Sequence, residues 1–209
     1  MMTNKALETS ASLMTGSSSV SDWVREAKQG SRWAFNQLID HFHKDIFRMV
    51  FYRIRNRPDA EDITQDVFLQ AFRNIAQLKT VEYFKAWLYR IAVNRIRDFY
   101  RKKRFLSLIG LFSESERFED DELNDIADKG SRPLEELLRK EFWRKFEKAL
   151  ENLSRMEKEV FILRFLDQLG IREISEILKK NESTVKTHLY RGLVKMRKND
   201  ELKNISMGG

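Results

Sequence analysis

Only two prolines, Pro58 and Pro133, occur in this chain of 209 residues, and glycine is also scarce, with eight residues. Because proline and glycine are the residues that most often break helices, their scarcity favours long helical segments. Apolar residues recur at steps of three and four, as in Phe35, Leu38 and Phe42, and there is little of the alternation typical of strands. The sequence therefore predicts an all-α protein.

The periodic segments fall into two blocks. Residues 1–21 are rich in Ser, Thr and Ala and predict a disordered tail. The first helical block covers 22–104, residues 105–132 lack sustained periodicity, and the second block covers 133–200. We therefore predict two small helical domains joined by a flexible linker.

In the first domain, the sequence predicts one helix that begins near Pro58 and another that begins at Phe84. Pro58 fits the first turn of a helix, and acidic residues follow it, as the helix dipole favours. We expect the apolar stripe of that helix in the core; it consists of Ile63, Val67, Phe68, Ala71, Phe72 and Ile75. A short polar connection then leads into a helix from Phe84 to about Arg104.

Charge is distributed in three blocks. The formal net charge is +7, and a basic balance favours a polyanionic partner, although solubility alone could account for it. Residues 84–104 hold eight basic side chains and one acidic one, residues 113–128 one basic and eight acidic, and residues 179–198 seven basic and one acidic. Two basic blocks separated by an acidic one favour nucleic acid as the partner.

The strongest local pattern is a helix-turn-helix near the C-terminus. Residues 171–178 predict a short amphipathic helix, Lys179 and Lys180 a turn, and Asn181 the N-cap of the next helix. Val185, Leu189, Gly192 and Met196 share the inner face of that second helix. We expect its outer face to contact DNA in the major groove through Ser183, Thr184, Lys186, Thr187 and Arg191. An ordinary helical hairpin would show the same periodicity.

The helix from Phe84 to Arg104 carries a basic stripe. At about 100° per residue, one face holds Arg90, Asn94, Arg97 and Arg101, and the opposite face holds Leu88, Ile91, Ala92 and Phe99. Trp87 lies at the edge of the stripe, and Tyr83 comes just before the helix. Cations beside aromatic rings suit melted or single-stranded nucleic acid. A solvated face with Trp87 in the core is the alternative.

No catalytic, metal or cofactor site is predicted. Carboxylates cluster at Asp59, Glu61, Asp62 and Asp66, which leaves a magnesium-dependent nuclease as a rival hypothesis. His41 and His43 flank Phe42 and diverge, and His188 lies in the predicted DNA-reading helix, so none of the three supports a metal site.

Cysteine is absent, which excludes disulfides and thiolate zinc sites and fits a reducing cytoplasm. The longest apolar stretch, near residues 105–112, is far shorter than the roughly 20 residues a membrane span needs, and no signal peptide is recognisable. We expect its apolar side chains to be covered either by a partner protein or by its own domain. We expect a cytoplasmic protein without membrane insertion.

Taken together, these segments resemble the small two-domain sigma factors of the extracytoplasmic-function group. The resemblance rests on Asp59-Ala-Glu-Asp-Ile-Thr-Gln-Asp-Val-Phe-Leu-Gln-Ala-Phe72, on Phe84-Lys-Ala-Trp-Leu-Tyr-Arg-Ile-Ala-Val-Asn94, on Glu157-Lys-Glu-Val-Phe-Ile-Leu-Arg-Phe165 and on Ser183-Thr-Val-Lys-Thr-His-Leu-Tyr-Arg191. It covers roughly 33–104 and 134–198, with the segments in the order and spacing of that group.

The resemblance implies a transcription-initiation factor, not an enzyme, that responds to envelope or other stress. Its partners would be core RNA polymerase, promoter DNA and an anti-sigma factor. Polymerase would bind Asp59, Glu61, Asp62, Gln65 and Asp66. The minus-ten element would be read and melted by Tyr83, Trp87, Arg90, Asn94, Arg97 and Arg101, and the minus-thirty-five element by the second helix of the helix-turn-helix. A dimeric helix-turn-helix regulator is the alternative function.

Four positions depart from that group. The group often has Gly where Lys179-Lys180 stands, Gly and Ser where Val81-Glu82-Tyr83 stands, and an apolar residue in place of Arg95. Primary sigma factors have a Trp pair where this chain has Trp87-Leu88. Base preference at the minus-ten element is therefore not carried over.

Overall fold

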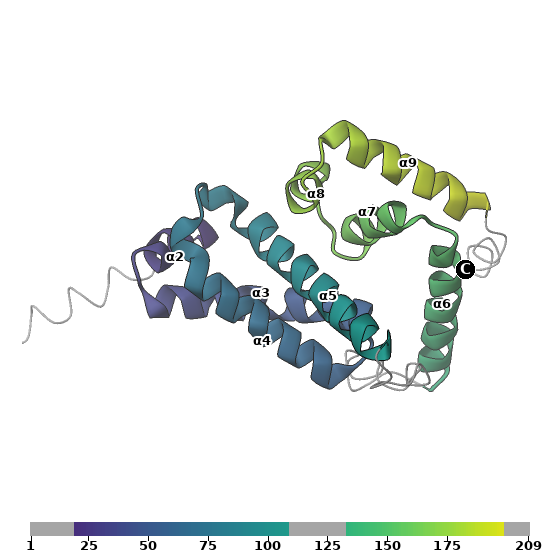
Figure 1. Ribbon diagram of the computed structural model, residues 1–209, viewed down its shortest axis with the longest axis horizontal. Coiled ribbons are helices and arrows are strands. Elements are labelled where there is room, and N and C mark those ends of the chain that lie inside the picture. The colour runs from purple at the N-terminus through teal and green to yellow at the C-terminus, as the bar shows by residue number, and fades with distance from the viewer. Residues whose placement is uncertain (1–18, 109–132, 199–209) are drawn as a thin grey trace, which may run out of the picture.

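The computed structural model describes residues 19–108 and 133–198, and all regular elements within those ranges are helical, which confirms the all-α prediction (Figure 1). An N-terminal domain contains α2 (Val20–Lys28), α3 (Arg32–Ile54), α4 (Arg57–Asn74) and α5 (Phe84–Leu108), with short 3-10 turns at Ile75–Gln77 and Val81–Tyr83. A C-terminal domain contains α6 (Pro133–Glu151), α7 (Arg155–Phe165), α8 (Ile171–Leu178) and α9 (Glu182–Lys198).

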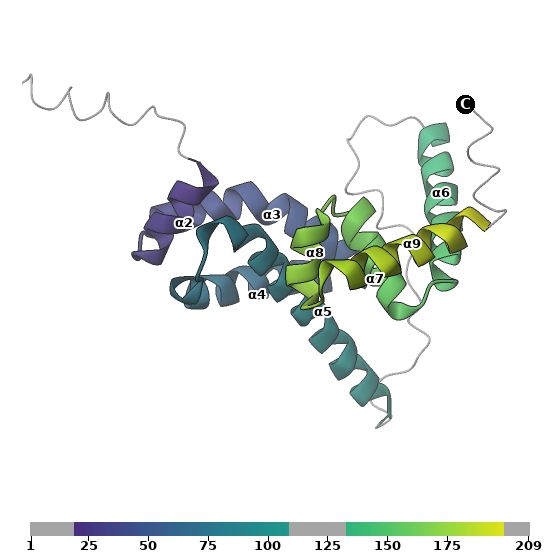
Figure 2. The ribbon, with the colours of Figure 1, turned by 90° about the horizontal axis from the view of Figure 1, so that it is seen from above.

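The N-terminal domain is organised around α3, which packs on α2, α4 and α5 (Figure 2). Its core is formed by the residues that share one face of α3, among them Leu38, Ile46 and Met49, all fully buried. Phe84, the first residue of α5, packs against Phe42 with 5.6 Å between ring centroids. The start of α5 is therefore fixed by the core, and the exposed faces of α4 and α5 are held at defined positions.

Helix α4 begins as expected. Asn56 is its N-cap, because the Asn56 side chain accepts a hydrogen bond from the Asp59 backbone N–H at 2.9 Å, and Pro58 occupies the first turn. Arg95, which replaces an apolar residue usual in related sequences, donates to Gln70 Oε1 at 2.9 Å and so links α5 to α4.

Two predicted bounds are wrong by a few residues. Helix α2 begins at Val20, inside the predicted 1–21 tail, because Ser19 and Asp22 form a capping box there. Helix α5 runs past Arg104 to Leu108, so the first four residues of the predicted 105–132 linker are helical. The remaining predicted tail and linker, residues 1–18 and 109–132, lie outside the described residues.

Phe72 is a further correction. It was predicted in the core with the rest of its stripe, but 47% of it is exposed, whereas Ile63, Val67 and Ala71 are buried. Its ring lies edge-on to that of Phe35, at 5.0 Å between centroids. Periodicity places Phe72 near the core side of α4, but the side chain lines an open hollow between α3 and α4, so it stays partly uncovered.

The C-terminal domain is tied together by Glu157. Ser154 and Glu157 form a capping box at the start of α7, and Lys195 of α9 donates to Glu157 Oε2 at 2.6 Å. These hydrogen bonds, first the one from Lys195 and then the one from the Ser154 backbone, lower the pKa of Glu157 to about 2. The carboxylate therefore stays charged and holds α7 to α9 over the physiological pH range.

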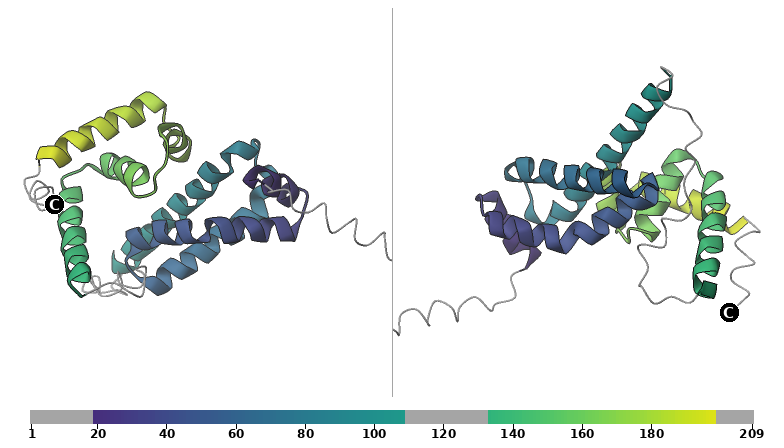
Figure 3. Two further views of the ribbon diagram at one scale, coloured as in Figure 1. Left: turned by 180° about the vertical axis from the view of Figure 1, so that it is seen from behind. Right: turned by 90° about the horizontal axis from the view of Figure 1, so that it is seen from below.

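The two domains pack against each other, which the sequence did not predict. Helix α8 lies on α5, and buried apolar residues of both domains form one continuous cluster (Figure 3). The C-terminal domain contributes Val160, Leu163, Leu169, Ile174, Ile177, Leu178 and Val185 to that cluster.

Candidate nucleic-acid interface

Helices α8 and α9 form the predicted helix-turn-helix. Lys179 ends α8 in the left-handed conformation, with φ of 51°, and its backbone N–H donates to the Ser175 carbonyl. Asn181 then accepts from the Thr184 backbone N–H at 2.8 Å and caps α9. A residue other than glycine costs about 1 kcal/mol in this conformation, and Lys179 adopts it here.

The two faces of α9 divide as predicted. Val185, Gly192 and Met196 are buried and Leu189 is partly buried, so this face packs on the domain core. On the opposite side Ser183, Lys186, Thr187 and Arg191 are exposed, and Thr184 is partly buried. The N-terminal half of α9 thus presents hydroxyl groups and cations on one open face.

That face also contains a residue the sequence reasoning missed. Tyr190, three residues after Thr187, is 70% exposed. Its spacing of four residues from Lys186 and three from Thr187 could have identified it, because such residues share one face of a helix. Lys186 lies 3.7 Å from Glu182 in an exposed pair, which is weak and leaves Lys186 available to a ligand.

The basic stripe on α5 is largely exposed. Asn94, Arg97 and Arg101 are exposed and Arg90 is partly buried. Arg101 is 81% exposed at its side chain and pairs at 3.0 Å with Asp98, one turn earlier. The opposite face packs into the core through the predicted residues Leu88, Ile91, Ala92 and, in part, Phe99. The structure therefore places these cations and Asn94 along one side of a firmly held helix.

The two aromatic residues near the start of α5 have different surroundings. Trp87 is partly buried, packs against the core and lies 5.8 Å from the Phe84 ring. Tyr83 is partly exposed, but its hydroxyl accepts a hydrogen bond from Arg172 of α8, and the Arg172 guanidinium lies 5.3 Å from its ring centroid. Arg172 of the C-terminal domain thus contacts both the hydroxyl and the ring of Tyr83 in this arrangement.

Helix α4 presents a second, acidic surface. Glu61, Asp62, Gln65 and Asp66 are exposed and Asp59 is partly buried; Glu61 pairs with Arg57 at 2.9 Å. Beside them lies an apolar hollow of about 550 Å³ between α3 and α4, which Leu69 and Phe72 help to line. The exposed side of α4 therefore combines the predicted carboxylates and Gln65 with apolar side chains that the sequence pattern did not indicate.

The described residues contain neither a cluster of metal-binding side chains nor a membrane-spanning helix. Within 19–108 and 133–198, no group of three or more His, Asp or Glu side chains lies close enough to hold a metal ion. No helix in the described part of the chain is long and apolar enough to cross a membrane.

Both domains match known protein families. Residues 38–105 match the Sigma-70 region 2 family, and residues 143–196 match the Sigma-70, region 4 family. The first match contains α4 and most of α5, and the second contains the helix-turn-helix.

Similar full-length sequences come from several bacteria. RNA polymerase sigma factor SigV of Bacillus subtilis is 32% identical, over 77% of this chain and 86% of SigV. ECF RNA polymerase sigma factor SigW of the same species is 29% identical, over 84% of this chain and 93% of SigW. The ECF RNA polymerase sigma-E factor of Escherichia coli is 29% identical, over 80% of this chain and 87% of its own length.

Two solved structures share the fold. CnrH, solved in complex with the cytosolic domain of CnrY, matches 85% of this chain and 94% of its own with a TM-score of 0.60 at 21% identity. The sigma factor RpoE of Bartonella quintana, solved with the anti-sigma factor NepR, matches 81% of this chain and 96% of its own with a TM-score of 0.59 at 23% identity.

Proposed function

The chain belongs to the extracytoplasmic-function group of sigma-70-type RNA polymerase sigma factors, and from this membership we propose which residues carry each step of its work. It is a transcription-initiation factor, and sigma factors in general are not enzymes. Its DNA-binding regions serve promoter recognition by RNA polymerase. Our residue assignments rest mainly on one observation. Helices α5 and α9 each pack one face into a buried core and leave the opposite, basic face exposed.

The outer face of α9 reads the minus-thirty-five element. Helices of this type place their N-terminal residues against base edges in the major groove. Ser183, Thr184, Lys186, Thr187 and Arg191 lie at that position in α9, and Val185 and Leu189 have a structural role. Tyr190 extends the same face and adds apolar surface beside the hydroxyl groups and cations.

The exposed side of α5 binds the minus-ten element. Arg90, Asn94, Arg97 and Arg101 supply hydrogen-bond donors to the phosphates of a displaced strand along three turns of helix. Tyr83 and Trp87 supply ring faces on which an unstacked base can rest. Trp87 already has much of its surface packed on the core, so Tyr83 is the more accessible of the two once the C-terminal domain moves away.

Helix α4 docks on core polymerase. Its acidic residues Asp59, Glu61, Asp62 and Asp66, with Gln65 between them, provide charge and hydrogen bonding. The neighbouring hollow with Leu69 and Phe72 provides apolar area that water would otherwise cover. The complementary surface on polymerase is therefore expected to be basic with an apolar ridge.

Charge reversal on α4 should weaken polymerase binding. We expect Asp62→Lys or Asp66→Lys to raise the Kd for core polymerase at least tenfold, roughly the effect of losing one close charge pair. Neither side chain packs in the core, so helicity by circular dichroism should be unchanged. Glu26→Lys, an equal charge change at an exposed site on α2, is the control. Unchanged pull-down of core by both α4 variants would refute this assignment.

A regulatory protein is a further proposed partner. CnrH and RpoE were each solved with a second protein, in the case of RpoE an anti-sigma factor. We propose that an anti-sigma factor likewise binds this chain, and that the chain acts in the cytoplasm, where RNA polymerase transcribes DNA. Its inducing signal would be envelope or other stress.

Run-off transcription tests the proposed function directly. Purified factor mixed with core polymerase and a promoter library should produce transcripts that start at defined positions, and core alone should not. A dimeric regulator would instead bind DNA without core and would not confer promoter-specific initiation. Absence of specific transcripts over the whole library, with folded factor bound to core, would contradict the proposed function.

A further inference from the structure

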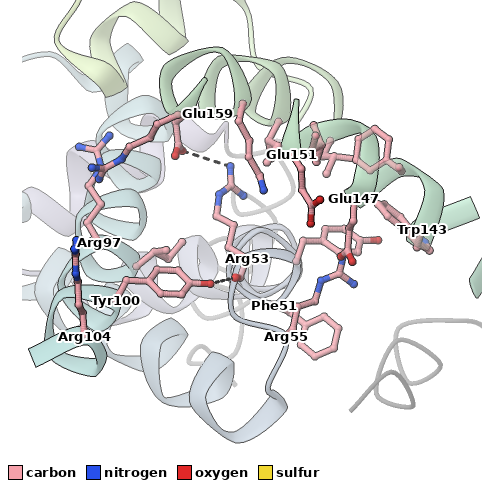
Figure 4. Close-up of a pocket in the computed structure, with 18 of the residues that line it drawn as sticks. Phe51, Arg53, Arg55, Arg97, Tyr100, Arg104, Trp143, Glu147, Glu151 and Glu159 are labelled. Carbon is pink, nitrogen blue, oxygen red and sulfur yellow. Dashed lines mark hydrogen bonds and ion pairs between the residues drawn. The ribbon is translucent and has the colours of Figure 1, made fainter. Parts of the chain in front are cut away.

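A cavity lies between α3 and α5 on one side and α6 and α7 on the other (Figure 4). Its volume is about 1090 Å³, and pockets that hold small molecules usually measure about 300–1,000 Å³. Interiors of folded domains are close-packed and contain few voids of this size. The cavity is therefore large enough to hold a whole organic molecule.

Positive charge is in excess in the lining of this cavity. Eight of the lining side chains are Arg or Lys, and four are Asp or Glu. Three of the four carboxylates already lie next to an arginine that also lines the cavity, in the pairs Asp98–Arg101, Glu147–Arg55 and Glu159–Arg53. The other cations thus face little negative charge, and cations that line a cleft together attract anions into it.

Four of these cations are exposed and have no ion-pair partner within residues 19–108 and 133–198. Two of them, Arg97 and Arg104, belong to α5, and the other two, Arg155 and Lys158, belong to α7. Arginine binds phosphate through two parallel hydrogen bonds, and lysine binds it as a point charge. The lining is therefore suited to hold a phosphate-bearing molecule from two sides.

Tyr100 adds an aromatic surface between the two arginines of α5. It lines the cavity and is 43% exposed, and its hydroxyl donates to the Arg53 carbonyl, which fixes the far end of the ring. Arg97 lies three residues before Tyr100 and Arg104 four residues after it, so the three side chains share one face of α5. Figure 4 shows Tyr100 between these two arginines.

Arg53 also lines the cavity, but its charge is used within the protein. It donates to Asp167 Oδ2 at 2.8 Å, and its side chain is 9% exposed. Burial by itself lowers the pKa of Arg53, but the attraction of Asp167 and Glu159 outweighs burial and raises the pKa above its ordinary value. Arg53 therefore supports the wall on which Tyr100 rests and does not count among the cations open to a ligand.

An aromatic ring beside several unpaired cations suits a phosphorylated base. Every base has a π-face that can stack on an aromatic side chain. A terminal phosphate carries about −1.5 to −2 charge at neutral pH, so a chain of phosphates approaches the charge of four cations. Inorganic phosphate would leave the Tyr100 ring uncovered, and an apolar molecule would leave the cations unpaired. A nucleoside with a phosphate chain uses both features.

We propose that this cavity binds a nucleoside triphosphate, with the base on Tyr100 and the phosphates between Arg97 and Arg104 on one side and Arg155 and Lys158 on the other. The site goes beyond the proposed function, because it takes a free small molecule. It shares Arg97 with the proposed minus-ten surface, but α6 and α7 have no part in that surface. Binding is therefore measured on the factor alone, without polymerase or DNA.

Isothermal titration calorimetry of the full-length factor with ATP and with GTP tests the site. In about 0.15 M salt, where charges more than about 8 Å apart are largely screened, one or both should bind saturably with one nucleotide per chain. Inorganic triphosphate has the charge without the base, so it should bind at least about fivefold more weakly. No binding of either nucleotide up to about 1 mM, or equally tight binding of inorganic triphosphate, would overturn the proposal.

Substitutions then locate the bound nucleotide. Tyr100→Leu removes the ring and should raise the Kd for the nucleotide about 5- to 150-fold, with the Kd for inorganic triphosphate unchanged. Tyr100→Phe keeps the ring and should bind normally, although it loses the hydrogen bond to Arg53. Arg155→Gln with Lys158→Gln should raise the Kd for both compounds at least about tenfold.

The control removes two cations outside the cavity. Lys179→Gln with Lys180→Gln, at exposed positions between α8 and α9, should leave both dissociation constants unchanged. Circular dichroism should show equal helicity in all variants, and Arg155 and Lys158 are exposed, so their loss does not disturb the core. Normal nucleotide binding by folded Tyr100→Leu or by the Arg155 and Lys158 double variant would overturn the site. An equal loss in the control would overturn it as well, since charge alone would then explain binding. Run-off transcription is measured separately, so failure of the proposed function is distinguishable from failure of this site.

Discussion

Loss of Lys186 and Arg191 together is expected to abolish the footprint of the polymerase–factor complex on the upstream promoter element. Both side chains project from the open face of α9, and neither contributes to the buried core. A good contact to a base edge is worth about 1–3 kcal/mol. The double variant Lys186→Ala with Arg191→Ala should therefore weaken binding of an upstream-element duplex at least about 30-fold.

The measurement needs a control of equal charge. Arg197→Ala with Lys198→Ala removes two cations from the C-terminal end of the same helix, away from the proposed reading face. This control should weaken binding to specific and unrelated DNA alike and only modestly, as loss of phosphate attraction does. A normal footprint with the double variant Lys186→Ala, Arg191→Ala would show that α9 does not recognise the upstream promoter element.

Promoter opening is expected to fail when the aromatic residue Tyr83 is removed. Unstacking DNA costs a few kcal/mol per step, and a base stacked on an aromatic ring returns about 1–3 kcal/mol. Tyr83→Ala should therefore reduce permanganate reactivity of the melted region by about 5- to 150-fold while closed-complex binding remains normal. Tyr83→Phe keeps the ring, so it should retain reactivity although it loses the hydroxyl that meets Arg172.

For Trp87 variants, the thermal stability of the protein must be measured together with the permanganate reactivity of the promoter. Its ring packs on Phe84 and the core, so Trp87→Ala should also lower the free energy of unfolding, by about 1–3 kcal/mol. Thermal unfolding of Trp87→Ala and Trp87→Phe separates the two roles, because Phe keeps much of the packing. Normal reactivity in both Tyr83→Ala and Trp87→Ala, in folded protein, would exclude these residues from melting. This chain offers less aromatic surface for base stacking than a Trp pair does, because the residue after Trp87 is Leu88, which is aliphatic and buried.

Local signals predicted most helix bounds. Asn56, Ser154 and Asn181 each satisfy a backbone N–H that a helix start leaves unpaired, and the structure has α4, α7 and α9 starting beside them. Such signals act over three or four residues, so they are readable without knowledge of the fold. The start of α2, which was not predicted, has the same kind of signal, because Ser19 stands three residues before Asp22. That signal lies in a segment whose composition alone had indicated a disordered tail.

Exposure of the α4 surface required the tertiary structure. Periodicity places Phe72 in the stripe with Val67 and Ala71, but only the path of α3 determines how much of the stripe is covered. The apolar part of the proposed polymerase surface was therefore not predictable, although its carboxylates were. The inward and outward faces of α9 were predictable, because a helix that packs on a single core shows its pattern along its own length.

By itself the sequence determined the all-α class, the helix-turn-helix and the residues of the two open basic faces, because periodicity, caps and charge are properties of neighbours in the chain. Only the tertiary structure decided that Arg53 meets Asp167, 114 residues away, and that Arg172 contacts Tyr83. An isolated arginine in an amphipathic helix looks like any surface cation. Its burial depends on a second domain docking over it, and that docking follows from shape and apolar area assembled from several helices, which no local pattern records.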